Sequence, residues 1–166
     1  MSILYVFDAV LMGVGATLLI DLWALILRHT FSVRSLDYCL LGRWVLGIPG
    51  GVVKHDNIAA AARQPHECTV GWTTHYLIGT AFAVVFVLLA SEGWLARPTL
   101  LPALAFGAAT VVVPFFTVQP SFGLGIASSK TPHPNRARLK SLMTHSVFGI
   151  GLYLSAALLS AIRPLA

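Results

Sequence analysis

Charged side chains are scarce in this sequence of 166 residues. Asp, Glu, Lys and Arg together make up 10% of it, whereas hydrophobic residues make up 57%. A soluble globular domain carries about 25% charged residues, because charges cover the surface that faces water. The composition therefore excludes an ordinary water-soluble domain and predicts an integral membrane protein.

Cysteine is also rare, and the common catalytic motifs are missing. The two cysteines, Cys39 and Cys68, form no CxxC pair, and we expect them to be unpaired thiols. The sequence contains no HExxH, no phosphate-binding glycine loop, no dinucleotide-binding glycine pattern and no GxSxG. An enzymatic function therefore has no support in the sequence.

Four stretches are long and apolar enough to cross a bilayer, which takes roughly 20 residues of helix. Their approximate bounds are residues 3–27, 70–90, 100–118 and 141–162. Each must be helical, because an open sheet would leave backbone groups unpaired in lipid. We predict an all-α fold, a single transmembrane domain over residues 1–166 built as a four-helix bundle, with a kink at Pro114.

The connector between the first two spans is too long to be a plain linker. Its residues 36–53 are mainly apolar, but they include Arg43 and the sequence Pro49-Gly50-Gly51, which argue against a fifth span. We predict an interfacial or re-entrant helix in this segment, with Trp44 at the level of the lipid headgroups.

The basic residues are distributed unevenly among the connectors. Nine lie in the first and third connectors, at positions 28, 34, 43, 54, 63, 130, 136, 138 and 140, and only Arg97 and Arg163 lie elsewhere. Cytoplasmic loops of membrane proteins carry an excess of Lys and Arg. We predict that the first and third connectors are cytoplasmic and that both termini are periplasmic. Both cysteines would then lie in a reducing compartment.

The same distribution indicates the partners of the protein. Because the basic residues are confined to connectors, the formal charge of +5 does not indicate nucleic acid. We expect the main partner to be the lipid bilayer, with anionic lipid headgroups at Arg136, Arg138 and Lys140.

Two similar stretches predict an internal repeat. The sequence TTHYLIG occupies residues 73–79 and MTHSVFG occupies residues 143–149, each at the start of a span. The preceding spans contain GATLLID at 15–21 and AATVVVP at 108–114, in the corresponding order. We predict two copies of a helical hairpin related by an axis along the membrane normal. His75 would then correspond to His145.

Longer stretches resemble a known family. They are GRWVLGIPGG, HECTVGWTTHYLIG and QPSFGLGIASSKTPHPNRARLKSLMTHSVFGIGLYLSA. These stretches resemble a family of small proteobacterial inner-membrane proteins catalogued as a domain of unknown function. The resemblance covers most of the chain and implies a four-helix protein of the bacterial inner membrane. It implies no activity and no binding residues.

Three ionisable residues are expected at a similar depth. His75 and His145 lie about five residues inside their spans, or roughly 7 Å deep, and Asp21 lies roughly 10 Å deep. Ionisable residues inside a membrane normally face the bundle interior and are candidate functional groups. We expect these three to share one pocket, with Glu67 and Gln119 at its edge. The two histidines would lie within about 10 Å of each other, a separation that one metal with a water, or one haem, would span.

Three functions remain open at this point. In the first, the pocket binds a transition metal, a haem or a small polar ligand. The cofactor-binding candidates are His75, His145, Asp21 and Gln119, and the metal ligands are His75, His145, Asp21 and Glu67. The second function is a proton- or ion-coupled transporter or channel, acting as a homo-oligomer because four short helices enclose little lumen. The third is a structural or assembly role without a ligand.

Overall fold

The computed structural model describes residues 3–33, 35–90 and 93–162, and all regular elements within these ranges are helical. Four helical segments are long and apolar enough to cross a membrane, namely Tyr5–Phe31, Glu67–Leu89, Leu100–Ser121 and Pro134–Ile162. The predicted all-α fold with four spans is confirmed. Two basic residues that contribute to the charge bias, Arg34 and Arg163, lie outside the described residues.

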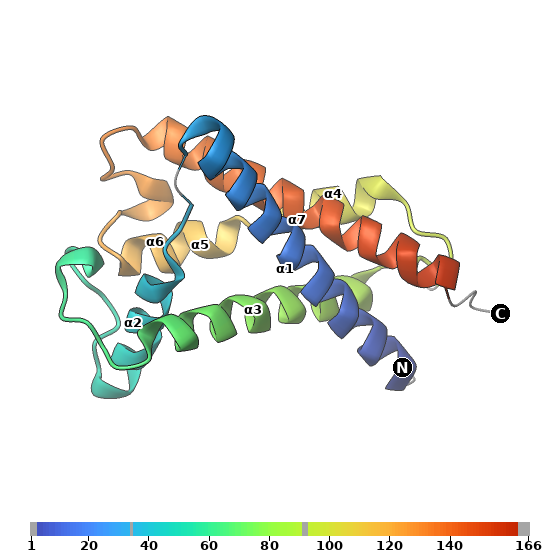
Figure 1. Ribbon diagram of the computed structural model, residues 1–166, viewed down its shortest axis with the longest axis horizontal. Helices are drawn as coiled ribbons and strands as arrows, with labels where there is room; N and C mark the ends of the chain where they lie inside the picture. Colours follow the sequence, from blue (N-terminus) through green and yellow to red (C-terminus); the bar gives the residue numbers. More distant parts are fainter. Residues whose placement is uncertain (1–2, 34, 91–92, 163–166) are drawn as a thin grey trace. The chain divides into compact units, whose positions relative to one another are not determined.

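Three of the spans are continuous helices: α1 (Ile3–Phe31), α3 (Glu67–Leu89) and α7 (Pro134–Ile162) (Figure 1). Helices α1 and α7 have 29 residues each, or about 43 Å, and exceed a hydrocarbon core of about 30 Å. Helix α7 begins seven residues earlier than the predicted span. Its first residue is Pro134, and proline is favoured there because the first helical N–H needs no partner within the helix.

The third span is interrupted. It consists of α4 (Leu100–Ala109), α5 (Val112–Phe116) and α6 (Val118–Ser121). Proline has no N–H, so Pro114 cannot donate to the carbonyl of Thr110, four residues earlier. The α-helix breaks at that residue, where the N–H of Thr110 bonds to the carbonyls of both Phe106 and Gly107. The predicted kink is therefore a break in the helix.

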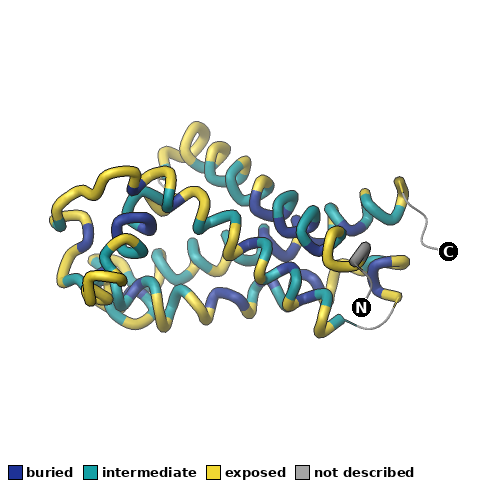
Figure 2. The backbone as a smooth tube through the Cα atoms, turned by 90° about the horizontal axis from the view of Figure 1, so that it is seen from below, coloured by how far each residue is buried: buried dark blue, intermediate teal, exposed yellow. Residues whose placement is uncertain are grey.

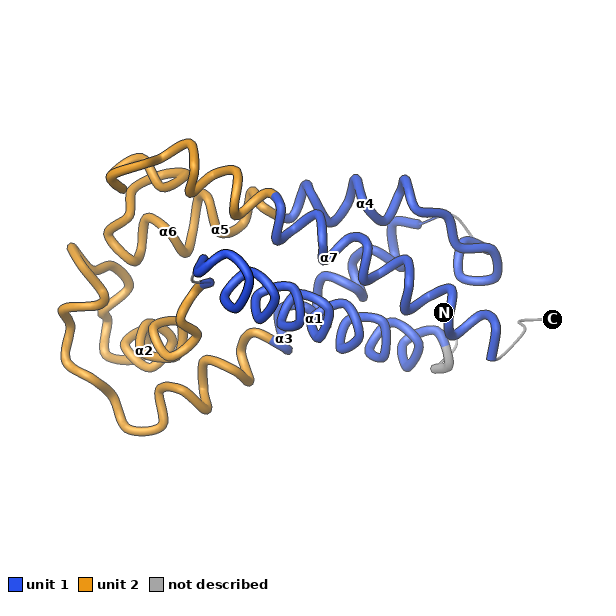
Figure 3. Tube along the Cα trace, turned by 45° about the horizontal axis from the view of Figure 1, so that its top comes forward, with its two compact units in different colours: residues 1–35, 76–110, 143–166 blue, residues 36–75, 111–142 orange. Residues whose placement is uncertain are grey.

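The chain divides into two compact units, which are coloured separately in Figure 3. Unit 1 contains residues 1–35, 76–110 and 143–166, and unit 2 contains residues 36–75 and 111–142. Helix α3 passes from unit 2 to unit 1 between His75 and Tyr76, and α7 does so between Leu142 and Met143.

Unit 1 is held together by close approaches between helices at glycines. A Cβ atom on Gly13 would lie 2.5 Å from the Cα of Thr80, and one on Gly151 would lie 2.6 Å from the Cα of Ala16. Small residues at such crossings let helix backbones approach closely in a membrane. The apolar core around these crossings includes Met12, Ala16, Ala83, Phe86, Ala103, Phe148, Leu152 and Ala156.

Large apolar side chains cover much of the outside of the spans. Exposed positions recur along the long helices in Figure 2, and they include Leu18, Leu77, Leu101 and Leu158. In water such surfaces would be unstable, because apolar area gains free energy by leaving water. They suit helices whose outer faces meet lipid.

Unit 2 is built from the two long connectors and the segments next to them. It contains α2 (Tyr38–Gly47), η1 (Ile48–Gly50), η2 (Ile58–Ala60) and η3 (Ile126–Ser128). The N–H of His55 bonds to the carbonyl of Ser121, and that of Ile58 bonds to the carbonyl of Phe122. Leu41, Ile58 and Phe122 form a small buried core.

Helix α2 lies in the segment for which an interfacial or re-entrant helix was predicted. Its ten residues extend about 15 Å, half of a hydrocarbon core, so it is not a fifth span. Trp44 donates from Nε1 to the carbonyl of Val53, 3.0 Å away, and this bond ties α2 to the chain that follows η1.

One prediction for unit 2 is wrong: Cys39 and Cys68 are not unpaired thiols but form a disulfide. The bond is feasible because the first turn of α2 lies against the first turn of α3. This proximity is set by tertiary packing. A search of the sequence for a CxxC pair cannot detect two cysteines that are 29 residues apart.

Candidate functional site

The first polar contact inside the spans joins α1 to α3. The hydroxyl of Tyr76 donates to Oδ2 of Asp21 at 2.8 Å. The helices are brought this close by the glycines farther along them, since a Cβ on Gly79 would overlap the hydroxyl of Thr17. Asp21 therefore has a neutral hydroxyl as a hydrogen-bond donor.

The second polar contact joins the end of α4 to α7. The hydroxyl oxygen of Thr110 lies 2.7 Å from Nδ1 of His145 and 2.6 Å from the carbonyl oxygen of Gly107. A hydroxyl has one hydrogen to donate, and the carbonyl can only accept. Nδ1 of His145 must then be the donor to Thr110. In the neutral imidazole, Nε2 is consequently the atom with the free lone pair.

These two contacts lie at similar depths within unit 1. Helices α1 and α7 cross at Ala16 and Gly151. From that crossing Asp21 is five residues along α1, about 7.5 Å, and His145 is six residues back along α7, about 9 Å. Helices α1 and α7, the first and fourth spans, run in opposite directions (Figure 1), so both displacements point toward the same end of unit 1. We call the four residues Asp21, Tyr76, Thr110 and His145 the polar layer.

The other predicted site residues belong to unit 2. The ring of His75 stacks on that of Tyr38, with a centroid separation of 3.9 Å and an angle of 22° between the planes. The buried Gln119 accepts a bond from the hydroxyl of Ser128 at 2.9 Å and donates to that of Ser141 at 3.2 Å. Gln119 thus fastens α6 to η3 and to the third turn of α7.

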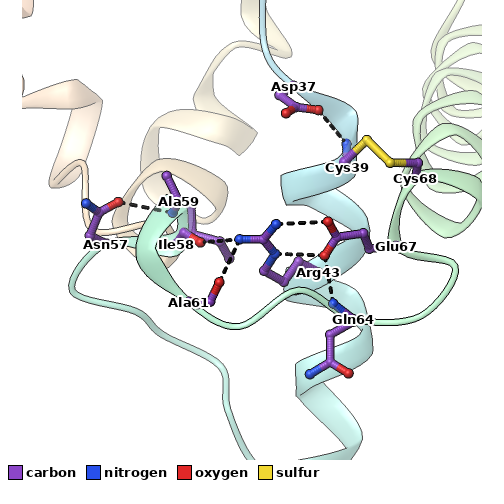
Figure 4. Close-up of polar contacts among 10 residues, drawn as sticks. All are labelled: Asp37, Cys39, Arg43, Asn57, Ile58, Ala59, Ala61, Gln64, Glu67 and Cys68. Atoms are coloured by element: carbon purple, nitrogen blue, oxygen red, sulfur yellow. Dashed lines mark hydrogen bonds and ion pairs between the residues drawn. A yellow bond between two sulfur atoms is a disulfide. The ribbon is translucent and has the colours of Figure 1, made fainter.

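Glu67, the first residue of α3, is buried against Arg43 of α2 (Figure 4). Its carboxylate accepts from Nε of Arg43 at 2.8 Å and from Nη2 at 2.9 Å. Nη1 donates to the carbonyls of Ile58 and Ala61, each at 2.9 Å. The hydrogen bonds to Glu67 raise the pKa of Arg43 above its ordinary value, so the guanidinium stays charged. We call this ion pair, with the disulfide beside it, the α2–α3 junction.

Close backbone contact completes the α2–α3 junction. A Cβ on Gly42 would overlap the carbonyl oxygen of Glu67, and one on Gly71 would overlap the carbonyl oxygen of Tyr38. Only glycine permits this approach. The disulfide, the bidentate ion pair and the two glycines therefore act on the same pair of helix ends.

The structure thus distributes the five predicted residues over both units. Asp21 and His145 belong to unit 1. His75, Glu67 and Gln119 belong to unit 2. Within residues 3–33, 35–90 and 93–162, no group of three or more His, Cys, Asp or Glu side chains is arranged to hold a metal ion. A pocket shared by both histidines remains a prediction.

Sequence reasoning missed three residues of these sites: Tyr76, Thr110 and Arg43. Tyr76 directly follows His75, which the sequence predicts as a site residue. Thr110 lies in the stretch 108–114 of the proposed repeat, where it corresponds to Thr17. In the sequence, Arg43 argues against a fifth span and contributes to the charge bias of the connectors, and neither pattern indicates that it is buried. Its buried position follows from the tertiary packing of α2.

Comparison with known protein families identifies the chain. The model of a family described as "Protein of unknown function (DUF2938)" matches residues 10–159, and the chain belongs to that family. No curated protein and no solved structure matches it. Family membership therefore brings no activity with it, and the function has to be argued from the polar layer.

Proposed function

We propose that this chain is a proton-translocating protein of the bacterial inner membrane, with Asp21 and His145 as the groups that carry the proton. Ionisable side chains inside spans are rare and costly, and they mark proton relays and ion pathways in membrane proteins. Here each ionisable group contacts one hydroxyl group: Asp21 contacts Tyr76, and His145 contacts Thr110.

The observation that carries this proposal is the arrangement at His145. Because Thr110 donates to the carbonyl of Gly107, it orients the imidazole with its proton on Nδ1 and its lone pair on Nε2. Such a ring accepts a proton at Nε2 without losing its contact to Thr110. Asp21 accepts a hydrogen bond from a neutral phenol, which supports either protonation state.

The proposed orientation follows from the charge bias, and the proposed assembly follows from the apolar outer faces of the spans. With the first and third connectors in the cytoplasm, the polar layer is nearer the cytoplasmic than the periplasmic surface, and both termini are periplasmic. The apolar outer faces of the spans suit packing against lipid or against further copies. A homo-oligomer provides the lumen that one small bundle lacks.

The test is proton flux through purified protein in liposomes, driven by a potassium diffusion potential and followed with a pH-sensitive dye. We expect flux above that of empty liposomes, reduced to that background by Asp21→Asn and by His145→Gln. The matched control is Asp8→Asn on the same helix, 13 residues or about 20 Å away, which should retain the flux. Wild-type flux equal to that of empty liposomes would overturn the proposal.

A second candidate is the binding of a transition metal or a haem in the polar layer, because Nε2 of His145 is also a ligand atom. A visible absorption spectrum and a metal determination on the same preparation separate the two functions. Stoichiometric metal or a Soret band that His145→Gln abolishes would favour binding. Flux by a colourless protein without stoichiometric metal would favour translocation.

A further inference from the structure

The disulfide in the α2–α3 junction has features of a reactive bond. Cys39 is the second residue of α2 and Cys68 the second residue of α3, so both sulfur atoms lie at helix N-termini. The backbone N–H groups and the dipole of a helix N-terminus stabilise negative charge. Each sulfur therefore lies where a departing thiolate is stabilised.

The two cysteine residues differ in exposure. Cys68 is exposed, whereas Cys39 is only partly accessible and is followed by the buried Leu41, Gly42 and Arg43. Thiol–disulfide exchange requires a thiolate to reach one sulfur atom in line with the S–S bond. An attacking thiol would reach Cys68 first and release Cys39.

The junction does not depend on the disulfide alone. The two hydrogen bonds between Arg43 and Glu67 and the backbone contacts at Gly42 and Gly71 join the same helix ends. Opening the S–S bond would leave these contacts in place. A bond whose loss leaves its surroundings folded can open and close without unfolding the junction.

The charge bias adds a second, independent argument. The connectors that hold unit 2 carry nine of the eleven basic residues, so in the orientation proposed above the disulfide lies on the cytoplasmic side. In the cytosol thiols are kept reduced, and the disulfides that do form there are usually transient and either catalytic or redox-sensing. A permanent structural disulfide is not expected in that compartment.

We infer that Cys39 and Cys68 form a redox-active pair that exchanges with a cytoplasmic thiol of the glutathione class. A thiolate attacks Sγ of Cys68, a new S–S bond forms there, and Cys39 leaves as a thiolate. A second thiolate attacks the sulfur of the bound thiol, releasing the small disulfide and the Cys68 thiolate. Two electrons pass from two thiols to the protein disulfide, and the two protons of those thiols are available to Cys39 and Cys68.

The first test is a redox titration of the full chain, purified in detergent, in glutathione buffers of increasing reduced fraction. The reduced protein is measured by a mass-tagged maleimide after acid quenching. We expect a reversible transition while the thermal unfolding midpoint shows that the fold persists. A bond that survives every native buffer and opens only on unfolding would overturn the inference and make the disulfide structural.

Single variants test which sulfur is attacked. In Cys39→Ser the remaining Cys68 can form a mixed disulfide with oxidised glutathione. In Cys68→Ser only Cys39 can do so. We expect at least tenfold faster labelling of Cys68, because it is the exposed partner. Equal rates, or faster labelling of Cys39, would contradict the proposed direction of attack.

The last test uses intact cells, quenched with acid and labelled in the same way. We expect reduced protein in growing cells, oxidation by diamide, and reduction again after the diamide is removed. Protein that is fully oxidised in growing cells would overturn the inference. The Asp21→Asn variant should behave like the wild type, so failure here is distinguishable from failure of the proposed proton pathway.

Discussion

The α2–α3 junction and the polar layer both depend on glycine to bring two helices together, but they are fastened by opposite means. At the junction a charged guanidinium makes four hydrogen bonds, two to a carboxylate and two to carbonyls, beside a covalent bond. In the polar layer the hydrogen bonds join a hydroxyl to an ionisable side chain. The junction is held by a covalent bond and a charged pair, whereas the contacts of the polar layer each involve a neutral hydroxyl.

This difference fits the surroundings of the two regions. The junction lies where the first connector meets the first turn of the span that begins at Glu67, and there a full ion pair and its carbonyl partners satisfy one another. The polar layer lies inside spans, where a full charge is expensive and a hydroxyl satisfies either protonation state of its neighbour. A firm fastening at the start of a span, and ionisable groups paired with hydroxyls inside the spans, are compatible with the proton relay proposed above.

The largest expected effect comes from adding one methyl group at the junction. In Gly71→Ala the new Cβ would overlap the carbonyl of Tyr38, and backbone atoms cannot move aside as a flexible side chain can. We expect a loss at or above the upper end of the usual overpacking cost of about 1–3 kcal/mol. Thermal unfolding in detergent, followed by circular dichroism, measures it.

The matched control is Gly50→Ala in the same unit. No atom lies within 4 Å of a Cβ built at Gly50, and this glycine is not among those with positive φ. Its unfolding midpoint should stay close to that of the wild type. If both substitutions were tolerated equally, close backbone contact would not be what holds α2 against α3.

The second effect concerns the ion pair, and its pattern matters more than its size. Arg43→Met and Glu67→Leu each leave a buried polar partner without its counterpart, so each should lower the unfolding midpoint. The double variant removes both charges and should recover the part of that loss due to an unpaired charge, because apolar replacement of a whole ion pair is often neutral. The carbonyls of Ile58 and Ala61 lose the Arg43 donor in the double variant too, so recovery should be incomplete. A double variant less stable than either single one would show that the two residues act independently.

Much of the fold is predictable from the sequence, because spans are specified by their own composition. The long apolar runs correctly predict all four membrane-length helical segments. Pro114 indicates the disruption of the third one, in which α4 ends at Ala109. The ends of helices were less predictable. Helix α7 extends back to Pro134 through Arg136, Arg138 and Lys140, since a helix continues past the membrane surface wherever its residues permit it.

The junction was not predicted, because it joins residues far apart in the chain. Cys39 and Cys68 are separated by 29 residues, and pairing them requires that the ends of α2 and α3 meet. One signal was present in the sequence: CLLG at 39–42 and CTVG at 68–71 repeat Cys-x-x-Gly at two helix starts. In each stretch the glycine follows the cysteine by about one helical turn. The disulfide and the close backbone contacts at Gly42 and Gly71 therefore lie on the same faces of α2 and α3.

The smallest expected effect on stability is in the polar layer, and it completes the comparison. Tyr76→Phe removes only the hydroxyl that donates to Asp21. Hydrogen bonds between membrane helices contribute about 0.6 kcal/mol on average, so we expect a loss near that value in detergent unfolding. Tyr5→Phe, at an exposed tyrosine of α1, is the matched control and should change the stability less. Proton flux in liposomes should nevertheless fall clearly in Tyr76→Phe, because Asp21 loses the donor that positions its carboxylate. A large loss of stability with unchanged flux would make the polar layer a structural fastening and not a proton pathway.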